Sequence, residues 1–208
     1  EGNINDYSSN FTTYVNRYAS VLNDVSVNAD YTILYQHAVN SDEIVYSSAL
    51  GANDEYNFNS NASLQFNLTG NLFVGSLKFQ NGATLYAPNE SAIFHIGNDF
   101  QWNGTVETDD MISAAQHIMV YYYGTNRVFV QTDFAGTIIA PNAEVVVGQS
   151  GKNFYGAIFA KSIVIHQNTK ITWVPFVSMQ MGSTVVDAGN QNLNYTVRFF
   201  GGRYAKNI

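Results

Sequence analysis

Two segments of this chain repeat each other at an offset of 20 residues. Residues Phe134–Val145 read FAGTIIAPNAEV and Phe154–Ile165 read FYGAIFAKSIVI, with Phe, Gly, Ile and Ala at equivalent positions. Phe73–Leu77 repeats the opening, and Thr84–Asn89 repeats the Thr-x-x-Ala-Pro-Asn part. A period near 20 residues with several strands in each repeat is typical of a β-solenoid, in which each coil stacks on its neighbours.

The rest of the chain after residue 24 alternates with a period of two, as strands do. Runs rich in Val, Ile, Phe, Tyr and Thr are separated by Gly, Asn and Asp, and the Ala-Pro-Asn segments suit corners because Pro cannot donate to a sheet ladder. We therefore predict an all-β, single-stranded β-helix, right-handed by preference. Examples of the strands expected are Ser63–Leu68, Asn71–Phe79, Ala83–Tyr86, Ala92–Ile96, Arg127–Gln131, Ala143–Val147 and Ser162–His166.

Residues 6–24 carry the one convincing helical pattern in the sequence. Apolar residues recur there at spacings of three and four, and Asp6 or Ser8 can cap the start. We expect this amphipathic helix (1–24) to cap one end of the β-helix (25–176), and strands within 177–208 to close or extend the other end. The three parts form one domain. The helical stripe consists of Tyr7, Phe11, Tyr14, Val15, Tyr18, Val21 and Leu22.

The repeats, together with the preceding helix and strands, resemble a known family. The segments at 134–145 and 154–163 are similar to those of the choice-of-anchor A domains, and the resemblance extends over roughly residues 5–176. Those domains are β-helical modules of exported bacterial proteins, often tethered to the cell surface. The resemblance implies an adhesive role and carries over no catalytic residues.

Charge is sparse and unevenly placed. Charged residues occupy 12% of positions, against about 25% in an average soluble domain. Residues 1–110 contain 13 of the 16 acids but only Arg17 and Lys78 among the bases. Without a basic stripe to neutralise phosphates, nucleic-acid binding is not expected. No apolar run approaches the ~20 residues of a membrane span, so we expect no membrane insertion.

The absence of cysteine is compatible with an oxidising environment, because it avoids misoxidation outside the cell. The first residues, Glu1-Gly2-Asn3, do not resemble a signal peptide, so we expect that any such signal has been removed. These features favour an extracellular or cell-surface location.

Three acids form the densest carboxylate cluster, Glu107, Asp109 and Asp110. Calcium takes six or more oxygen ligands, often from clustered carboxylates, so these residues are candidate Ca²⁺ ligands. A solvated loop is the alternative, and no other cofactor is expected.

The histidines show no metal-ligand spacing, and alternation predicts exposed strand positions for His95 and His166. Glycosidases and lyases with similar folds need acids that converge on one groove. No such convergence is visible here, so we expect no enzymatic activity, and a carbohydrate-active enzyme is only a third alternative.

Aromatic side chains on an outer face could bind sugar rings or a protein surface. Because strand side chains alternate, Tyr121–Tyr123 must place at least one ring outward, and Tyr155 should point opposite to Phe154. The candidate ligand contacts are Trp102, Tyr121, Tyr123, Tyr155 and Trp173.

Together these features favour an extracellular, non-catalytic adhesion module that binds a glycan or a protein of a host or neighbouring cell. The alternative is a structural subunit that self-assembles into a surface filament or matrix. Asn-x-Ser/Thr sequons, which are glycosylation candidates in an exported protein, begin at Asn10, Asn61, Asn67, Asn89, Asn103 and Asn194.

Overall fold

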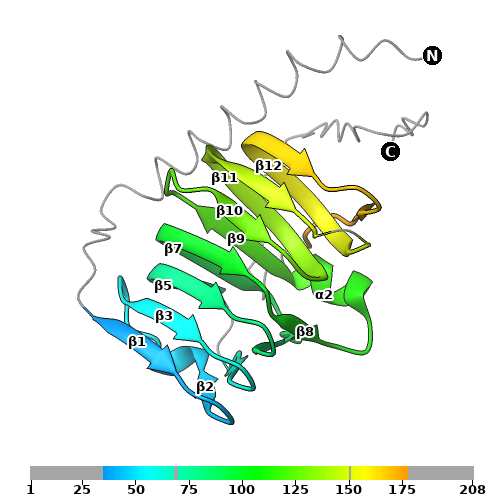
Figure 1. Ribbon diagram of the computed structural model, residues 1–208. Coiled ribbons are helices and arrows are strands. Elements are labelled where there is room, and N and C mark those ends of the chain that lie inside the picture. Colours follow the sequence, from blue (N-terminus) through cyan, green and yellow to red (C-terminus); the bar gives the residue numbers. More distant parts are fainter. Residues whose placement is uncertain (1–34, 68–69, 150, 178–208) are drawn as a thin grey trace, which may run out of the picture.

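The computed structural model describes residues 35–67, 70–149 and 151–177. These residues form a β-solenoid of about seven turns, which confirms the predicted fold class (Figure 1). The helix expected at 6–24 and the C-terminal strands expected beyond Val177 lie outside the described residues. The hand of the coil stays a prediction.

The described residues form thirteen strands, one 3-10 turn, η2 (Ser47–Ala49), and one helix, α2 (Met111–His117). The strands are β1 (Gln36–Val39), β2 (Ile44–Tyr46), β3 (Glu55–Phe58), β4 (Ser63–Gln65), β5 (Gly70–Phe79), β6 (Thr84–Tyr86), β7 (Ala92–Trp102), β8 (Thr105–Glu107), β9 (Ile118–Tyr122), β10 (Val128–Val130), β11 (Phe134–Val147), β12 (Asn153–Ile165) and β13 (Lys170–Trp173).

All strand pairs are parallel, as a coil that returns to the same side once per turn requires. The larger sheet has the order β1-β3-β5-β7-β10-β11-β12-β13, with β9 between β7 and β11, and β2-β4-β6-β8 form a second sheet. The long strands turn a corner within their length, where the register shifts between Val74 and Ser76 and between Ala140 and Glu144. Pro141 lies in the second shift, so the corner expected at Ala-Pro-Asn is confirmed there.

Inward side chains at matched positions stack along the axis and form the core. The rings of Phe58 and Phe79 lie parallel with centroids 4.9 Å apart, and Phe79 lies 4.8 Å from Trp102. Trp102 also contacts the ring of Phe134, and Phe134 that of Phe154, with centroid separations of 5.2 and 5.4 Å, although Phe134 and Phe154 occupy a neighbouring inward row. Such offset and edge contacts add to the free energy gained by burying the rings.

One four-residue turn recurs at the same corner of the coil. It joins β1 to β2 (40–43), β3 to β4 (59–62), β5 to β6 (80–83) and β12 to β13 (166–169). In each turn the first carbonyl accepts a hydrogen bond from the fourth amide, at 3.0–3.3 Å. The third residue is always left-handed, which suits Asn, Asp and Gly. These residues are Asp42 (φ 62°), Asn61 (64°), Gly82 (86°) and Asn168 (59°).

The repeated glycines of the sequence lie where two successive backbones approach closely. Gly136 and Gly156 are paired on β11 and β12 and have φ values of 147° and 139°. A Cβ on Gly156 would overlap the carbonyl oxygen of Gly136. The repeat therefore keeps glycine because successive backbones approach too closely for a side chain.

Candidate functional site

An apolar row runs along one outer face of the solenoid. Phe73, His95, Tyr121, Ile139 and Phe159 occupy matched positions on β5, β7, β9, β11 and β12. Their strand neighbours point into the core, so this row, which we call the outer row, points away from it. Met119 and Ile139 form a hydrophobic cluster separate from the core, with Phe176 packed against it.

His95 is the polar centre of the outer row. Its imidazole stacks between Phe73 and Tyr121, with centroid distances of 4.4 and 5.1 Å. Its Nδ1 lies 2.7 Å from the Tyr123 hydroxyl and its Nε2 2.8 Å from Asn71 Oδ1. The side chain is only 2% exposed, so the expectation of an exposed histidine is wrong.

Burial also determines the charge state of His95. Removal from water disfavours the imidazolium and lowers the pKa of His95 to about 4. The ring is therefore neutral at physiological pH, and its two nitrogens are satisfied by Tyr123 and Asn71. This arrangement is a closed polar network inside an aromatic stack rather than an accessible acid or base.

The five candidate ligand contacts lie in different environments. Trp102 is 1% exposed and belongs to the core, where its indole N–H donates to the Asp133 carbonyl at 3.0 Å, so it is not available at the surface. Tyr121 and Tyr123 belong to the outer row and its polar network, and both are half-buried. Tyr155 packs against the core beside the buried Phe154. Trp173 is 56% exposed, near the end of the solenoid.

The candidate calcium ligands do not converge. The Asp110 carboxylate caps α2 by accepting from the Ile112 amide at 2.9 Å, which is the ordinary role of Asp at a helix start. Glu107 and Asp109 are exposed. Among the described residues, no group of three or more His, Cys, Asp or Glu side chains could hold a metal ion.

The sequons fall on turns and loops where they are described. Asn61 is the left-handed residue of a repeated turn, and Asn89 is exposed. Asn67 is also exposed, and its side-chain amide nitrogen donates to the Ser48 hydroxyl at 2.8 Å. Asn103 follows β7 and is half-buried. Asn10 and Asn194 lie outside the described residues.

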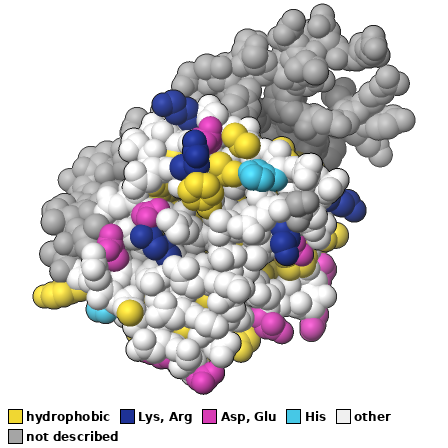
Figure 2. All heavy atoms as spheres, viewed as in Figure 1, with side chains coloured by type: hydrophobic (Ala, Val, Ile, Leu, Met, Phe, Trp, Pro, Cys, Tyr) yellow, Lys and Arg dark blue, Asp and Glu magenta, His cyan; other side chains and the backbone are white. Residues whose placement is uncertain are grey.

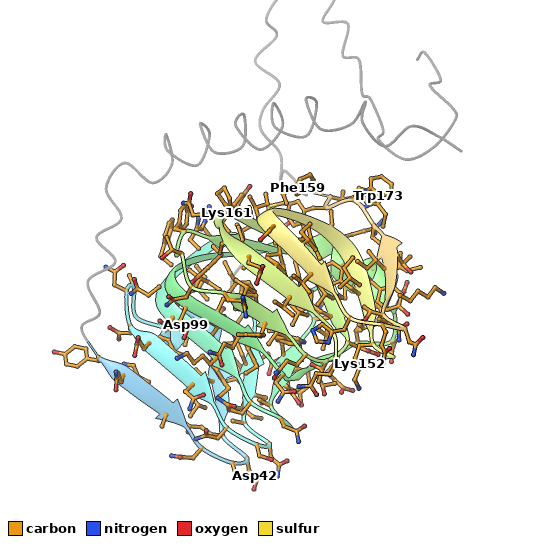
Figure 3. The ribbon with its side chains drawn as sticks, turned by 45° about the horizontal axis from the view of Figure 1, so that its top comes forward. Asp42, Asp99, Lys152, Phe159, Lys161 and Trp173 are labelled. Atoms are coloured by element: carbon orange, nitrogen blue, oxygen red, sulfur yellow. The ribbon has the colours of Figure 1, made fainter. Side chains whose placement is uncertain are left out.

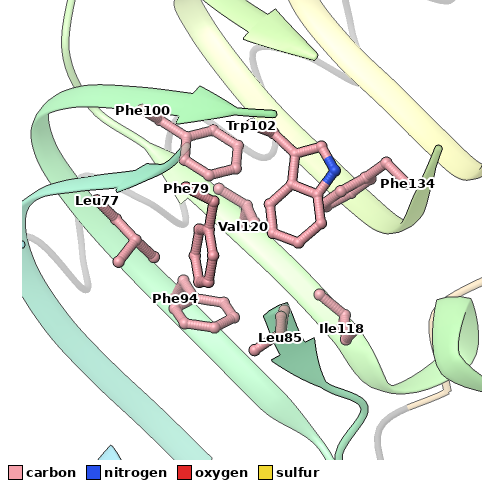
Figure 4. A pocket seen from close by; sticks show the side chains of 9 residues that line it. All are labelled: Leu77, Phe79, Leu85, Phe94, Phe100, Trp102, Ile118, Val120 and Phe134. Atoms are coloured by element: carbon pink, nitrogen blue, oxygen red, sulfur yellow. The ribbon is translucent and has the colours of Figure 1, made fainter. Parts of the chain in front are cut away.

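Within the described residues, the interior contains a small apolar cavity. Its volume is about 10 Å³, which is near the minimum for a single water. All of its lining side chains come from the stacked core rows (Figure 4). They are Leu77, Phe79, Leu85, Phe94, Phe100, Trp102, Ile118, Val120 and Phe134.

The last coil exposes positions that the preceding coils bury. Ile165 is paired with Val147, and both belong to the inward row of Phe58, Phe79 and Trp102. Val147 is 2% exposed, whereas Ile165 is 51% exposed. Ile163 and Ile171 also continue inward rows and are 39% and 40% exposed. We call Ile163, Ile165 and Ile171 the open end.

The two ends of the solenoid carry opposite charge. Residues 35–67 contain Asp42, Glu43, Asp54 and Glu55 and no Lys or Arg, whereas residues 151–177 contain three Lys and no Asp or Glu. The lowest charged side chains in Figure 2 are acidic and the uppermost are Lys or Arg. Figure 3 places Asp42 at the β1 end and Lys152 near β12, at the far end of the stack.

Residues 54–177 match the model of a family described as a domain of unknown function, DUF7305. The chain belongs to this family. The match in this DUF7305 chain runs from the residue before β3 to the end of the described solenoid, and it includes the outer row and the open end. No curated protein and no solved structure matches the chain. No helix within the described ranges is long and apolar enough to cross a membrane.

Proposed function

We propose that this chain is a non-catalytic structural subunit that associates with further copies through the ends of its solenoid. The observation that carries the proposal is the open end. Three isoleucines continue buried core rows and are nevertheless 39–51% exposed. Clustered exposed apolar residues of this kind mark interaction surfaces in folded proteins.

The backbone supports the same proposal. Ser162–Ile165 of β12 pair with β11 on one side, and no described strand pairs with them on the other. Such an edge presents N–H and C=O groups that an added strand can satisfy. Association there would extend the ladder and bury the open end in one step.

The non-catalytic part of the proposal rests on the chemistry of the described side chains. The most strongly perturbed histidine, His95, is enclosed and has both ring nitrogens occupied. Two acids of the first coils have local partners: Asp54 lies 2.9 Å from His37 Nε2, and Glu55 accepts from the Ser76 hydroxyl at 3.1 Å. We keep an extracellular or surface location as part of the proposal, on the composition and the resemblance to choice-of-anchor A domains.

Adhesion to a glycan or a surface protein is the second candidate function. The observation that favours it is the exposed side chain of Trp173, which is 56% exposed. Of the five candidate ligand contacts, only Trp173 is well exposed. Self-association therefore has the stronger structural support. A glycan and matrix-protein array probed with wild-type chain and with Trp173→Ala tests adhesion. Binding that the substitution abolishes would support it.

Self-association is tested with two neighbouring substitutions. Ile165→Glu places a charge on an inward row at the open end, whereas Val164→Glu places the same charge on the outer face one residue away. We expect concentration-dependent multimers of the wild-type chain by light scattering and electron microscopy. Ile165→Glu should abolish them and Val164→Glu should not. A wild-type chain that remains monomeric up to millimolar concentration would falsify the proposal.

A further inference from the structure

We infer that the copies join head to tail, with β1 and β2 of one copy continuing the coil beyond β12 and β13 of the next. This inference rests on the proposed function and specifies its partner surface, the acidic N-terminal coil of a second copy. Three independent features of the two ends argue for it.

The first feature is the shape of the turn at each end. The first described coil passes from β1 to β2 through residues 40–43, and the last passes from β12 to β13 through residues 166–169. Both are four-residue turns with a left-handed third residue, Asp42 at φ 62° and Asn168 at φ 59°. The turns at 59–62 and 80–83 show that this turn stacks on itself inside the solenoid. A second copy could therefore stack turn 40–43 on turn 166–169 in the same way.

The second feature is the continuity of the core rows. Val39 begins the inward row that ends at Ile165, and Val45 begins an inward row on the second sheet. In a head-to-tail stack, Val39 of one copy lies over Ile165 of the next, and Val45 lies over Ile171. Each contact repeats an apolar contact already present between neighbouring coils. The joint then resembles one more turn of the same solenoid.

The third feature is charge. In the head-to-tail joint, Glu43 of one copy lies above Thr169 of the next and beside its Lys170. The two stacked turns are one strand spacing apart, about 4.8 Å along the axis. Asp42 lies on the same corner. Both acids are exposed, as is Lys170. A tail-to-tail joint would instead bring the lysines of two open ends together, which like-charge repulsion opposes.

A head-to-tail joint uses two different surfaces of the chain and leaves one of each free after every addition. Such heterologous joints do not close unless the rotation between copies brings the ends together, so they generate open filaments. The expected product is therefore a polar filament, whose two tips differ in sequence and in charge.

Charge reversal tests the pairing of the ends. Glu43→Lys and Lys170→Glu should each weaken association about tenfold, because each places like charges across the joint. An equimolar mixture of the two variants should assemble as the wild type does, since every joint again unites opposite charges. Glu107→Lys is the matched control, because Glu107 is exposed on β8 in the middle of the stack. It should leave association unchanged.

The cysteine-free sequence allows a second, geometric test. Ser41 and Gln167 are the second residues of the first and last turns, so a head-to-tail joint places them one strand spacing apart, within disulfide reach. Ser41→Cys/Gln167→Cys should give a ladder of disulfide-linked multimers on oxidation. Ser41→Cys/Asn81→Cys, with its second cysteine in a mid-stack turn, should not.

The outcomes separate the inference from the proposed function. Multimers that Ile165→Glu abolishes but Glu43→Lys leaves intact, with no cysteine ladder, would overturn the head-to-tail joint while end association stands. A tail-to-tail joint would give this result, because it uses the open end, where Ile165 lies, and not the first coil, where Glu43 lies. A chain that never assembles overturns both. Rescue by mixing, together with the ladder, supports the joint as described.

Discussion

At the scale of single residues, two glycines decide how closely successive coils can approach. Gly136 and Gly156 lie opposite each other on β11 and β12, in backbone conformations that residues with side chains rarely adopt. The space that a Cβ would need on Gly156 is filled by the backbone of Gly136. Backbone cannot rotate away as a flexible side chain can, so the coil itself would have to shift.

We therefore expect Gly156→Ala to destabilise the fold by about 3 kcal/mol, from overpacking and a disfavoured φ together. Gly151→Ala is the control, because Gly151 also has a positive φ of 68° but no atom lies within 4 Å of an added Cβ. It should cost about 1 kcal/mol. Urea unfolding measures both. If the two substitutions lowered the free energy of unfolding equally, close approach of the backbones would not be the cause of the destabilisation.

His95 should make stability depend on pH. Its folded pKa of about 4 lies below the ordinary value of 6.5, so the unfolded chain binds a proton between these values that the folded chain does not. The free energy of unfolding should fall as pH drops from 6.5 to 4, by at most about 1.4 kcal/mol per pH unit. Below pH 4 this contribution no longer changes.

His95→Gln separates this contribution from the titrating carboxylates. The variant should lose the part of the pH slope between 4 and 6.5 that belongs to the imidazole, and urea unfolding at several pH values measures the difference. Its absolute stability will also fall because the ring stack is lost. If the two slopes coincide, His95 does not titrate as its burial requires.

Alternation along a strand identified the side of the sheet for these residues but not their depth. It correctly separates His95 from its inward neighbours, and Tyr121 from the buried Tyr122. It could not show that an outward row is itself buried, because burial of an outer face depends on what covers it. The prediction that Trp102 is a ligand contact is wrong, and its neighbour pattern, Phe100-x-Trp102, is that of an inward row.

At the scale of elements, the repeat predicted the long strands well. Asn71–Phe79, Ala92–Ile96, Ala143–Val147 and Ser162–His166 all fall largely within β5, β7, β11 and β12. The strands named from the pattern do not include β1, β2, β3, β8, β9 or β13, most of which have only three or four residues and so carry too little alternation to detect. Helix α2 was also missed. It interrupts the repeat between β8 and β9, and its only start signal is the Asp110 cap.

The stacked aromatic row is an element-scale feature whose energy can be measured. Phe79 lies between Phe58 and Trp102, is 1% exposed and borders the small cavity. Phe79→Ala should cost about 3–5 kcal/mol, because it removes ring contacts on both sides and enlarges a void. Tyr86→Ala on the exposed side of the neighbouring β6 should cost less than about 1 kcal/mol. Similar losses for both variants would contradict the stacked core.

At the scale of the whole molecule, stability should vary along the axis. Each coil contacts only its neighbours, so the stack behaves as a nearly one-dimensional array. Strand β1 pairs only with β3 among the described strands, whereas β7 and β11 have partners on both sides. Hydrogen exchange should therefore be fastest in the first coil and slowest in β7 and β11. Uniform protection would indicate that the described coils open as one unit.

Whole-chain composition concealed the most informative property of the surface. A net charge of -7 suggests a uniformly acidic protein, yet the described coils run from acidic to basic. A count by segment already indicates this gradient, because residues 1–110 contain 13 of the 16 acids but only two of the nine bases. The matching turns at the two ends could not have been found in that way, because Asp42 and Asn168 share a backbone conformation rather than a sequence motif.

The parallel stacking of the coils also determines how the molecule would respond to mechanical load. The hydrogen bonds between strands run along the solenoid axis. A stretching force applied to the two ends is therefore parallel to these hydrogen bonds. The hydrogen bonds between two coils then break before those of the next pair, so the coils separate one at a time. In a sheet pulled along its strands, all of these hydrogen bonds would bear the load together. Stretching of a chain of such coils should give a series of small, evenly spaced extensions, each releasing about one 20-residue turn.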